Sequence, residues 1–555
     1  MTALVANPAA VHVAADGVDW IVSGSWPFRA VDAIEAVDDF DAVVERLQGL
    51  PGEYSVIRLA AGGPVPLQAY RSITSTYDVF YGRRPGDDAI VVGDHFRNVL
   101  STLPVADRTV PPSTAVDHLL FGGRPNGTYV EEIRRLGHGE TLAWRAGSGP
   151  VTTLVDTPAV DEVIDPATAM RRLDAYLEEV GESYRDDPST VTMLSGGVDS
   201  TLLGTYARSE ASVSAGFDSP EFAFEVDYAT TASDLLGTDH EPLLFREDAF
   251  LTHLEAAIDA TGQPLPLPQG VLVALAVSET PHQSYLNGTL ADDLFGTGAA
   301  ALAYLGRFLG PACRVFPPVS WEAQALASTA ERIRRPVTAP DGAAMNFGIH
   351  VDQDQVGEMV GAAAVEARKR RRLDYTLRRV PENGRVGYGA HMHLGHCLAY
   401  FNDLTLTNQR HAAFAHGKSL LTPYAGRAVL ETSLAIRPDD RYARLSVPPR
   451  DHPTQWVLHK YLLKDLLHRR LPDYPTKQRK GQSLLPTGRY LEDGPLADVF
   501  DRYALPSFVP WEHRSLVRDG TEELSWYAAN YAIWRDRVHE NDDLEPVAST
   551  VVLER

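Results

Sequence analysis

The chain has 555 residues, and its 74 acidic side chains outnumber its 51 lysines and arginines to give a formal net charge of −23. A content of 44% hydrophobic and 23% charged residues is typical of a folded chain, and this length predicts more than one domain. The negative charge disfavours nonspecific binding to nucleic acid or to an anionic membrane, because such binding depends on clustered positive charge. The sequence shows no basic leader and no apolar stretch of about 20 residues, so a cytoplasmic protein is expected.

Residues 1–155 are expected to form a β-rich region. Short runs of β-branched and aromatic residues between Gly, Pro and Asp predict strands, and the first of them begins near Asp19. These strands are expected over 19–26, 54–61, 78–84 and 89–94. The stretch 146–166 combines turn residues with acidic ones, which predicts a boundary between a first domain (1–155) and a second domain (160–555).

In the second region, buried strands alternate with helices. An amphipathic helix precedes a strand over 189–194, and two more strand–helix pairs have their strands at 212–217 and 284–289. This alternation predicts an α/β domain with a doubly wound parallel sheet and crossover helices. From about 350 to 480 the pattern is largely helical.

The turn after the first of these strands reads Ser-Gly-Gly-Val-Asp-Ser and covers 195–200. Its glycines let the backbone approach a ligand, and the following helix presents free N–H groups and the positive end of its dipole. The serine hydroxyls add donors, and Asp199 can hold a divalent cation beside phosphates. The turn lacks the Gly-Lys-Ser/Thr ending of a Walker loop. It therefore predicts a pyrophosphate cradle, with a capped Gly-rich turn as the structural alternative.

A second polar motif, Asn-Gly-Thr-Leu-Ala-Asp-Asp-Leu-Phe-Gly, covers 287–296 at the end of another predicted strand. Because the ends of parallel strands converge on one crevice, both motifs are expected at a common site. Asp292 or Asp293 would then supply another oxygen ligand for Mg²⁺. The alternative is an acidic helix start, which the helix dipole favours by itself.

Together with Lys-Gln-Arg-Lys-Gly-Gln-Ser-Leu-Leu-Pro (477–486), these motifs resemble the synthetase domain of the asparagine synthase family. Members of this family are ATP pyrophosphatases of the PP-loop type that adenylate a carboxylate and release pyrophosphate. The resemblance covers most of 160–490 and implies ATP as substrate and Mg²⁺ held by Asp199 and Asp292. It implies nucleotide contacts by Met193, Leu194, Ser195, Gly196, Gly197, Asp199, Ser200, Ala215, Asn287 and Gly288.

Lys480 matches the lysine of the family's Lys-Gly loop, and the resemblance implies a catalytic role for it. The chain holds six lysines, so arginine is its usual cation. A lysine in a loop can place a point charge on the oxyanion that forms when an amine attacks an acyl-adenylate. The alternative is a solvated basic loop.

The N-terminal region is similar, over 52–61, 89–101 and 131–144, to the family's Ntn-type glutaminase domain. That domain uses an N-terminal cysteine, whereas this chain has Thr2 and no cysteine before Cys313. Thr2 is expected to lie too far upstream of the first strand to be built into a site. Residues 1–155 are therefore expected to be a degenerate, glutaminase-like β-sandwich.

Two further departures concern the synthetase half. Thr289 stands where the family has a glutamate and the β-lactam synthetases a tyrosine, so the general base is unassigned. The stretch 415–427 has Ser419, Leu421 and Ala425-Gly426 in place of the family's substrate-pocket residues. An aspartate-specific pocket is therefore not expected.

The function that follows is an AMP-forming ligase that joins a carboxylate to an amine. It resembles the β-lactam synthetases and lasso-peptide cyclases of specialised metabolism, such as antibiotic biosynthesis, which close an intramolecular amide. The alternatives are an ammonia-dependent asparagine synthetase-like enzyme and a nucleotide-binding scaffold.

The expected partner is a small-molecule or peptide substrate, and a homo-oligomer is compatible with the sequence. The run Arg368–Arg372 is the one basic block in this acidic chain. It predicts either a solvated helix face or a docking patch for an acidic peptide or carrier protein.

Overall fold

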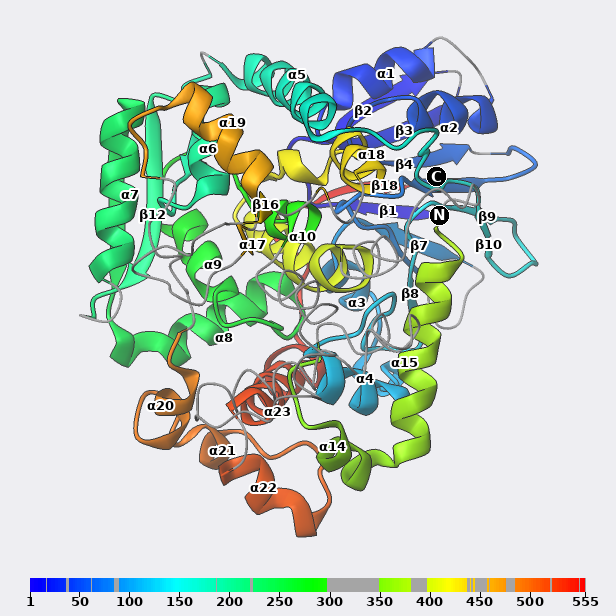
Figure 1. Cartoon of the computed structure of the whole chain (residues 1–555). Coiled ribbons are helices and arrows are strands. Elements are labelled where there is room, and N and C mark those ends of the chain that lie inside the picture. Colours follow the sequence, from blue (N-terminus) through cyan, green and yellow to red (C-terminus); the bar gives the residue numbers. More distant parts are fainter. Residues whose placement is uncertain are drawn as a thin grey trace, which may run out of the picture.

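Three large sheets carry the fold (Figure 1). The computed structural model describes residues 1–15, 17–35, 39–60, 62–83, 89–185, 187–219, 223–296, 349–380, 397–436, 440, 443–444, 457–458, 460–475, 485–519, 522–548 and 550–554. Among the helices of these residues, none combines the length and hydrophobicity needed to span a membrane.

Two of the sheets belong to the N-terminal region. The first has five strands in the order β18 (Val551–Glu554), β1 (Thr2–Val5), β7 (Ile90–Gly93), β6 (Phe80–Arg83) and β8 (Ile133–Arg135). The second has six, in the order β10 (Val151–Leu154), β9 (Glu140–Trp144), β5 (Leu67–Arg71), β4 (Tyr54–Ala60), β3 (Val18–Gly24) and β2 (Val11–Ala15). The four strands expected in this region are confirmed.

Side-chain alternation along β4 explains how these sheets pack. Ile57 and Leu59 point into a core shared with Val92 of the first sheet, so the two sheets form a sandwich. Tyr54 and Val56 point to the other face. That face is covered by helices α1 (Pro27–Glu35) and α2 (Phe40–Gln48). The expected β-rich sandwich is therefore present.

Strand β1 corrects the expectation about Thr2. Thr2 begins this strand, is 8% exposed and pairs in register with Val91 and Glu554. The position of the first strand near Asp19 was thus wrong, because the four-residue run of β1 is too short to show alternation by itself. Thr2 is built into the sandwich.

The third sheet is wholly parallel. Its order is β13 (Asp239–Phe245), β12 (Ala211–Phe217), β11 (Thr190–Met193), β14 (Ser284–Leu286) and β15 (Ser419–Leu421). The crossovers contain α6 (Val198–Ala207), α7 (Ala223–Leu236), α8 (Phe250–Thr261) and α9 (Gly270–Glu279). The strand order reverses between β11 and β14, and ligands bind at such a switch point in doubly wound sheets. The predicted parallel sheet with crossover helices is confirmed. Strands β13 and β15 were not predicted from the sequence.

Most other described segments are helical. They comprise α3 (Phe96–Leu100), α4 (Ser113–Phe121), α5 (Pro166–Tyr184), α10 (Ala291–Phe295), α14 (Gln353–Val360), α15 (Ala362–Leu377), the π-helical η3 (Cys397–Leu406), α17 (Thr407–Ala415), α18 (Arg427–Ala435), α19 (Tyr461–Arg470), α20 (Thr487–Glu492), α21 (Val499–Arg502), α22 (Arg514–Asp519), α23 (Glu522–Trp534) and the π-helical η7 (Arg535–His539). The helical pattern expected for 350–480 holds for most of the described part, with strands at β15 and at the short antiparallel pair β16 (Ala443–Arg444) and β17 (Val457–Leu458).

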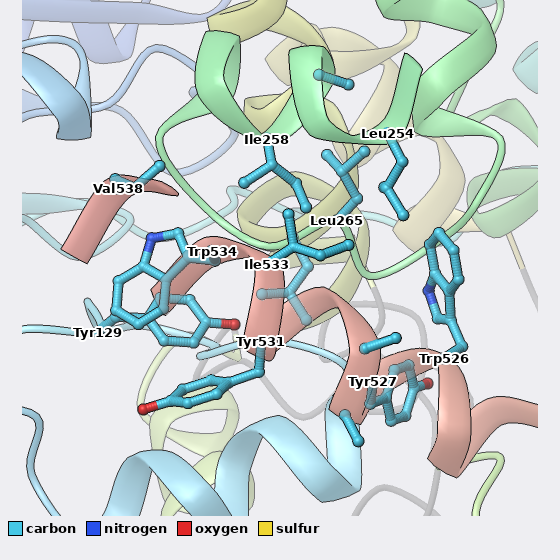
Figure 2. Close-up of a cluster of buried hydrophobic side chains, with 14 of the residues drawn as sticks. Tyr129, Leu254, Ile258, Leu265, Trp526, Tyr527, Tyr531, Ile533, Trp534 and Val538 are labelled. Atoms are coloured by element: carbon cyan, nitrogen blue, oxygen red, sulfur yellow. The ribbon is translucent and has the colours of Figure 1, made fainter. Parts of the chain in front are cut away.

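The C-terminal helix α23 joins the two regions through an aromatic core (Figure 2). The rings of Trp534 and Tyr129 lie 4.7 Å apart, centroid to centroid. Nearer the start of the helix, Trp526 packs near Phe250 of α8, with a centroid distance of 6.3 Å. The largest core is therefore shared between the halves of the chain, and the boundary near residue 155 stays a prediction.

A buried charge network lies across the same junction. The Asp403 carboxylate in η3 accepts hydrogen bonds from His138 Nε2 at 2.8 Å and Arg71 Nη2 at 3.1 Å. Arg135 reaches Asp403 at 3.4 Å and binds both oxygens of Asp78. Burial alone would raise the pKa of Asp403, but these neighbouring cations, with Arg135 the strongest, hold it well below its ordinary value. The two halves are thus joined by charges that must stay paired.

Two buried histidines make the stability of the chain sensitive to acid. His118 Nε2 donates to Tyr527 O at 2.6 Å and Nδ1 accepts from Tyr129 Oη at 2.9 Å, a pattern that satisfies neutral imidazole. Burial lowers the pKa of His118 from 6.5 to about 4. Burial, and then the charge of Arg71, lowers the pKa of His138 to about 4 as well.

Because both folded pKa values lie below the unfolded one, the unfolded chain binds more protons between these limits. The free energy of unfolding should therefore be highest above the unfolded pKa. It should decrease by about 3 kcal/mol per histidine as the pH is lowered through this range. Urea unfolding at several pH values checks this. The His118→Gln variant should show a shallower pH dependence than the wild type, and an unchanged dependence would contradict the assignment.

Candidate active site

The 195–200 loop follows β11 and leads into α6. Gly196 has φ +67°, and a Cβ there would lie 2.2 Å from the backbone of Tyr228, so only glycine fits. Ser195 Oγ accepts from Gly197 N at 3.3 Å and lies 3.1 Å from Ser200 Oγ. In the described part of the chain, no side chain caps the start of α6. An uncapped helix N-terminus of this kind attracts an anion.

The second motif lies directly against this loop. A Cβ on Gly288 would be 2.8 Å from Ser200 N, so glycine allows the turn after β14 to approach the start of α6. Asn287 N donates to Leu421 O at 2.9 Å, which ties the turn to β15. The Asn287 amide oxygen accepts from Thr289 N at 2.8 Å and Thr289 Oγ1 at 2.6 Å. The structure thus brings the two predicted motifs together.

Lys460 connects the acidic residues of the two motifs. Its Nζ lies 2.5 Å from Asp199 Oδ2 and 2.6 Å from Asp292 Oδ1. The Lys460 side chain is 6% exposed. Lys460 directly precedes α19 and has φ +53°. Burial would lower the pKa of Lys460, but Asp199 and then Asp292 outweigh that effect and raise it above the ordinary value. One ammonium therefore bridges two carboxylates and leaves one negative charge unbalanced among these three groups.

These two carboxylates fit the chemistry of a magnesium site. Mg²⁺ is usually held by one or two carboxylates together with substrate phosphates. Asp199 and Asp292 supply such oxygens beside a loop suited to phosphates. Of the two aspartates left open by the sequence, Asp292 contacts Lys460, whereas Asp293 is 1% exposed within α10.

Two tyrosines bind the backbone of the 195–200 loop. Tyr424 Oη donates to Asp199 O at 3.2 Å, and Tyr474 Oη donates to Gly196 O. Burial raises the pKa of Tyr474 to about 12, so it remains a neutral donor. Gln409 of α17 accepts from Asn287 Nδ2 at 3.2 Å. The sequence did not identify Tyr424, Tyr474, Gln409 or Lys460 as residues of the site.

The residues expected near the adenine differ in accessibility. Met193 and Ala215 are half-buried and pack against the same small core cluster near the ends of β11 and β12. Leu194 is 1% exposed and its side chain packs in another core, so only its backbone remains for a ligand.

The altered 415–427 stretch forms β15 and the turn after it. Ser419 pairs with Ser284 at the start of β14, which places it at the amino edge of the sheet, whereas Leu421 pairs with Leu286 beside the site. A Cβ on Gly426 would lie 1.8 Å from Tyr176 Oη, so no larger residue fits there. Lys480 lies outside the described residues, and its role stays a prediction.

Fold and site together define a doubly wound α/β protein with paired carboxylates at the switch point. The sequence model of the asparagine synthase family matches residues 174–524, which include the parallel sheet and the two motifs of the site. The chain therefore belongs to the asparagine synthase family, whose members are ATP-dependent carbon–nitrogen ligases. A comparison with curated proteins finds no match.

Proposed function

We propose that the chain is an AMP-forming ligase that adenylates a substrate carboxylate and couples it to an amine. The observation that carries this proposal is the meeting of Asp199 and Asp292, from two strand ends, at the Lys460 ammonium. The start of α6, which no described side chain caps, lies beside them. A site with these groups suits the triphosphate of ATP rather than an uncharged ligand.

In the proposed first step, a carboxylate oxygen of the substrate attacks the α-phosphorus of ATP and pyrophosphate leaves. The 195–200 loop would bind the departing pyrophosphate, and Lys460 would neutralise phosphate charge. Mg²⁺, when bound by Asp199 and Asp292, would offset further negative charge on the phosphates. In the second step, an amine attacks the acyl carbon and AMP leaves.

Catalysis would rest mainly on positioning and charge. Holding both reactants in line contributes up to about 7–11 kcal/mol in favourable cases. Thr289 does not fit as the base, because its hydroxyl already donates to Asn287 Oδ1 at 2.6 Å. The amine proton must therefore go to another group or to water.

The nitrogen would come from the substrate or from a second molecule. This proposal rests on the sequence, which has no cysteine before Cys313 to serve a glutaminase. Closure of an amide within one substrate, as in β-lactam synthetases and lasso-peptide cyclases, or condensation with a separate amine, satisfies this condition. Residues 1–155 would then act as a structural partner of the synthetase half.

The test is product analysis with Mg-ATP and pools of amino acids, β-amino acids and short peptides. We expect AMP and pyrophosphate in equal amounts with an amide product. In Lys480→Ala, amide formation should fall by about 10²–10³-fold, because the oxyanion loses its point charge. A pool of aspartate with ammonium tests the asparagine synthetase alternative.

Formation of ADP and phosphate, or bound ATP without turnover in every pool, would contradict the ligase proposal. Amide formation at the wild-type rate in Lys480→Ala would instead overturn only the role of that lysine.

A further inference from the structure

A cavity of about 200 Å³ lies between α15, α4 and the N-terminal sandwich, on the side of the molecule opposite α7 and β12 in Figure 1. Two carboxylates, Asp117 and Glu140, line it. Its five arginines are Arg135, Arg368, Arg371, Arg372 and Arg378. Such a concentration of positive charge is unusual in a chain with a net charge of −23.

The lining carboxylates are already bound to arginines. Asp117 accepts from Arg368 through both oxygens, at 2.6 Å for the Nε bond, and lies 3.3 Å from Arg124 Nε. Glu140 forms its ion pair with Arg379, at 2.6 Å, which is not a lining residue. The cavity therefore contains more guanidinium groups than carboxylates to pair with them.

Arg371 and Arg378 carry the excess charge. Among the described residues, neither forms an ion pair, and both keep exposed surface, although the cavity partly encloses Arg371. Burial lowers the pKa of Arg371, the neighbouring Arg368 lowers it further, and Arg378 adds to this repulsion while Asp117 opposes it. Two like charges at the mouth of a cavity attract an anion.

Four of the five lining arginines, all but Arg135 of β8, come from α15 or the residue directly after it, so the basic run is more than a solvated surface. Positions 368, 371, 375 and 378 recur at helical spacing, and all four line the cavity. Arg370 does not line it, has a 65% exposed side chain and reaches Glu366 at 3.8 Å. Arg372 stacks over Phe121, with 4.4 Å between guanidinium and ring centroid. The cavity wall is thus held in place.

We propose that this arginine cavity binds a small anion with carboxylate or phosphate groups. Guanidinium groups pair with both chemistries through two parallel hydrogen bonds. The volume is below the about 300–1,000 Å³ of sites for drug-sized molecules, which favours a compact ligand. This site is separate from Asp199 and Asp292 and does not depend on the ligase proposal.

Titration calorimetry at constant ionic strength tests the proposal, with citrate and inorganic phosphate as separate probes. We expect saturable binding of at least one probe. The double variant Arg371→Gln with Arg378→Gln should weaken it by about tenfold or more, because two charged hydrogen-bond donors are lost. The control Arg370→Gln removes one charge from the same helix and should leave binding unchanged.

Tighter binding of citrate would identify a carboxylate ligand, and tighter binding of phosphate a phosphorylated one. A probe that binds at the 195–200 loop instead would have the same affinity for both variants as for the wild type. The proposal is overturned if neither probe saturates, if the double variant binds as the wild type does, or if Arg370→Gln weakens binding to the same degree. Thermal unfolding of each variant shows whether it has folded.

Discussion

Replacing Asp199 with Asn is expected to reduce pyrophosphate release by about 10²–10³-fold, the usual effect of removing one preorganised electrostatic contact in a catalytic site. The amide keeps the size of the side chain and leaves the Tyr424–Asp199 backbone hydrogen bond intact. The loss should therefore reflect charge rather than folding. Steady-state pyrophosphate release measures it, at several Mg²⁺ concentrations, because the variant should need more Mg²⁺ than the wild type.

Two further variants make this result specific. Asp292→Asn should cause a similar loss, and the double variant should lose less than the two effects combined, because both carboxylates serve one ammonium and one cation. Asp234→Asn removes a charge from an exposed position on α7 and should have no effect. Wild-type turnover in Asp199→Asn would show that this carboxylate does not belong to the proposed site.

Replacing Lys460 with Met is expected to destabilise the protein by about 3 kcal/mol without Mg²⁺, because it leaves two carboxylates facing each other without a cation. Their side chains are 19% and 26% exposed, so water offsets only part of the repulsion. Added Mg²⁺ should stabilise this variant more than the wild type, since a cation that binds only the folded state shifts the unfolding equilibrium. Urea unfolding with and without Mg²⁺ measures both effects.

Arg469 offers the matched control for Lys460. It lies on the same helix and forms an ion pair with Asp465 at 2.6 Å, but its side chain is 60% exposed. Arg469→Met should cost less than about 1 kcal/mol and show no dependence on Mg²⁺. Equal destabilisation by the two substitutions, or no extra response of Lys460→Met to Mg²⁺, would show that Lys460 is only another surface cation.

The sequence was sufficient to predict the parallel sheet and the meeting of its two polar motifs. The strands at 189–194 and 284–289 are buried runs with turn residues at their ends, and adjacent strand ends must converge. By contrast, β13 contains a proline and charged residues, and β15 has three residues, so neither shows a clear pattern. Short or irregular strands gain their order from neighbours that a local pattern does not contain.

Lys460 shows why the site was only partly predictable. It lies 261 positions from Asp199 in the sequence, and nothing local indicates which carboxylates it contacts. The rarity of lysine was the one local sign that Lys460 could be a functional residue, since the chain holds only six lysines. The Gln409–Asn287 contact is equally nonlocal, with 122 positions between the partners. Local motifs therefore identified the two turns that meet at the site but not the groups that set the charge beside them.

The pairing of β1 with β18 constrains the order in which the chain acquires its structure during translation. Thr2 is in register with Glu554, so the outer edge of β1 remains open until the ribosome has synthesised residues 551–554. An open strand edge can pair with other chains, which makes a nascent or truncated product prone to aggregation. Synthesis of β18, rather than of residues 1–155 alone, is thus the step after which the N-terminal sandwich can close.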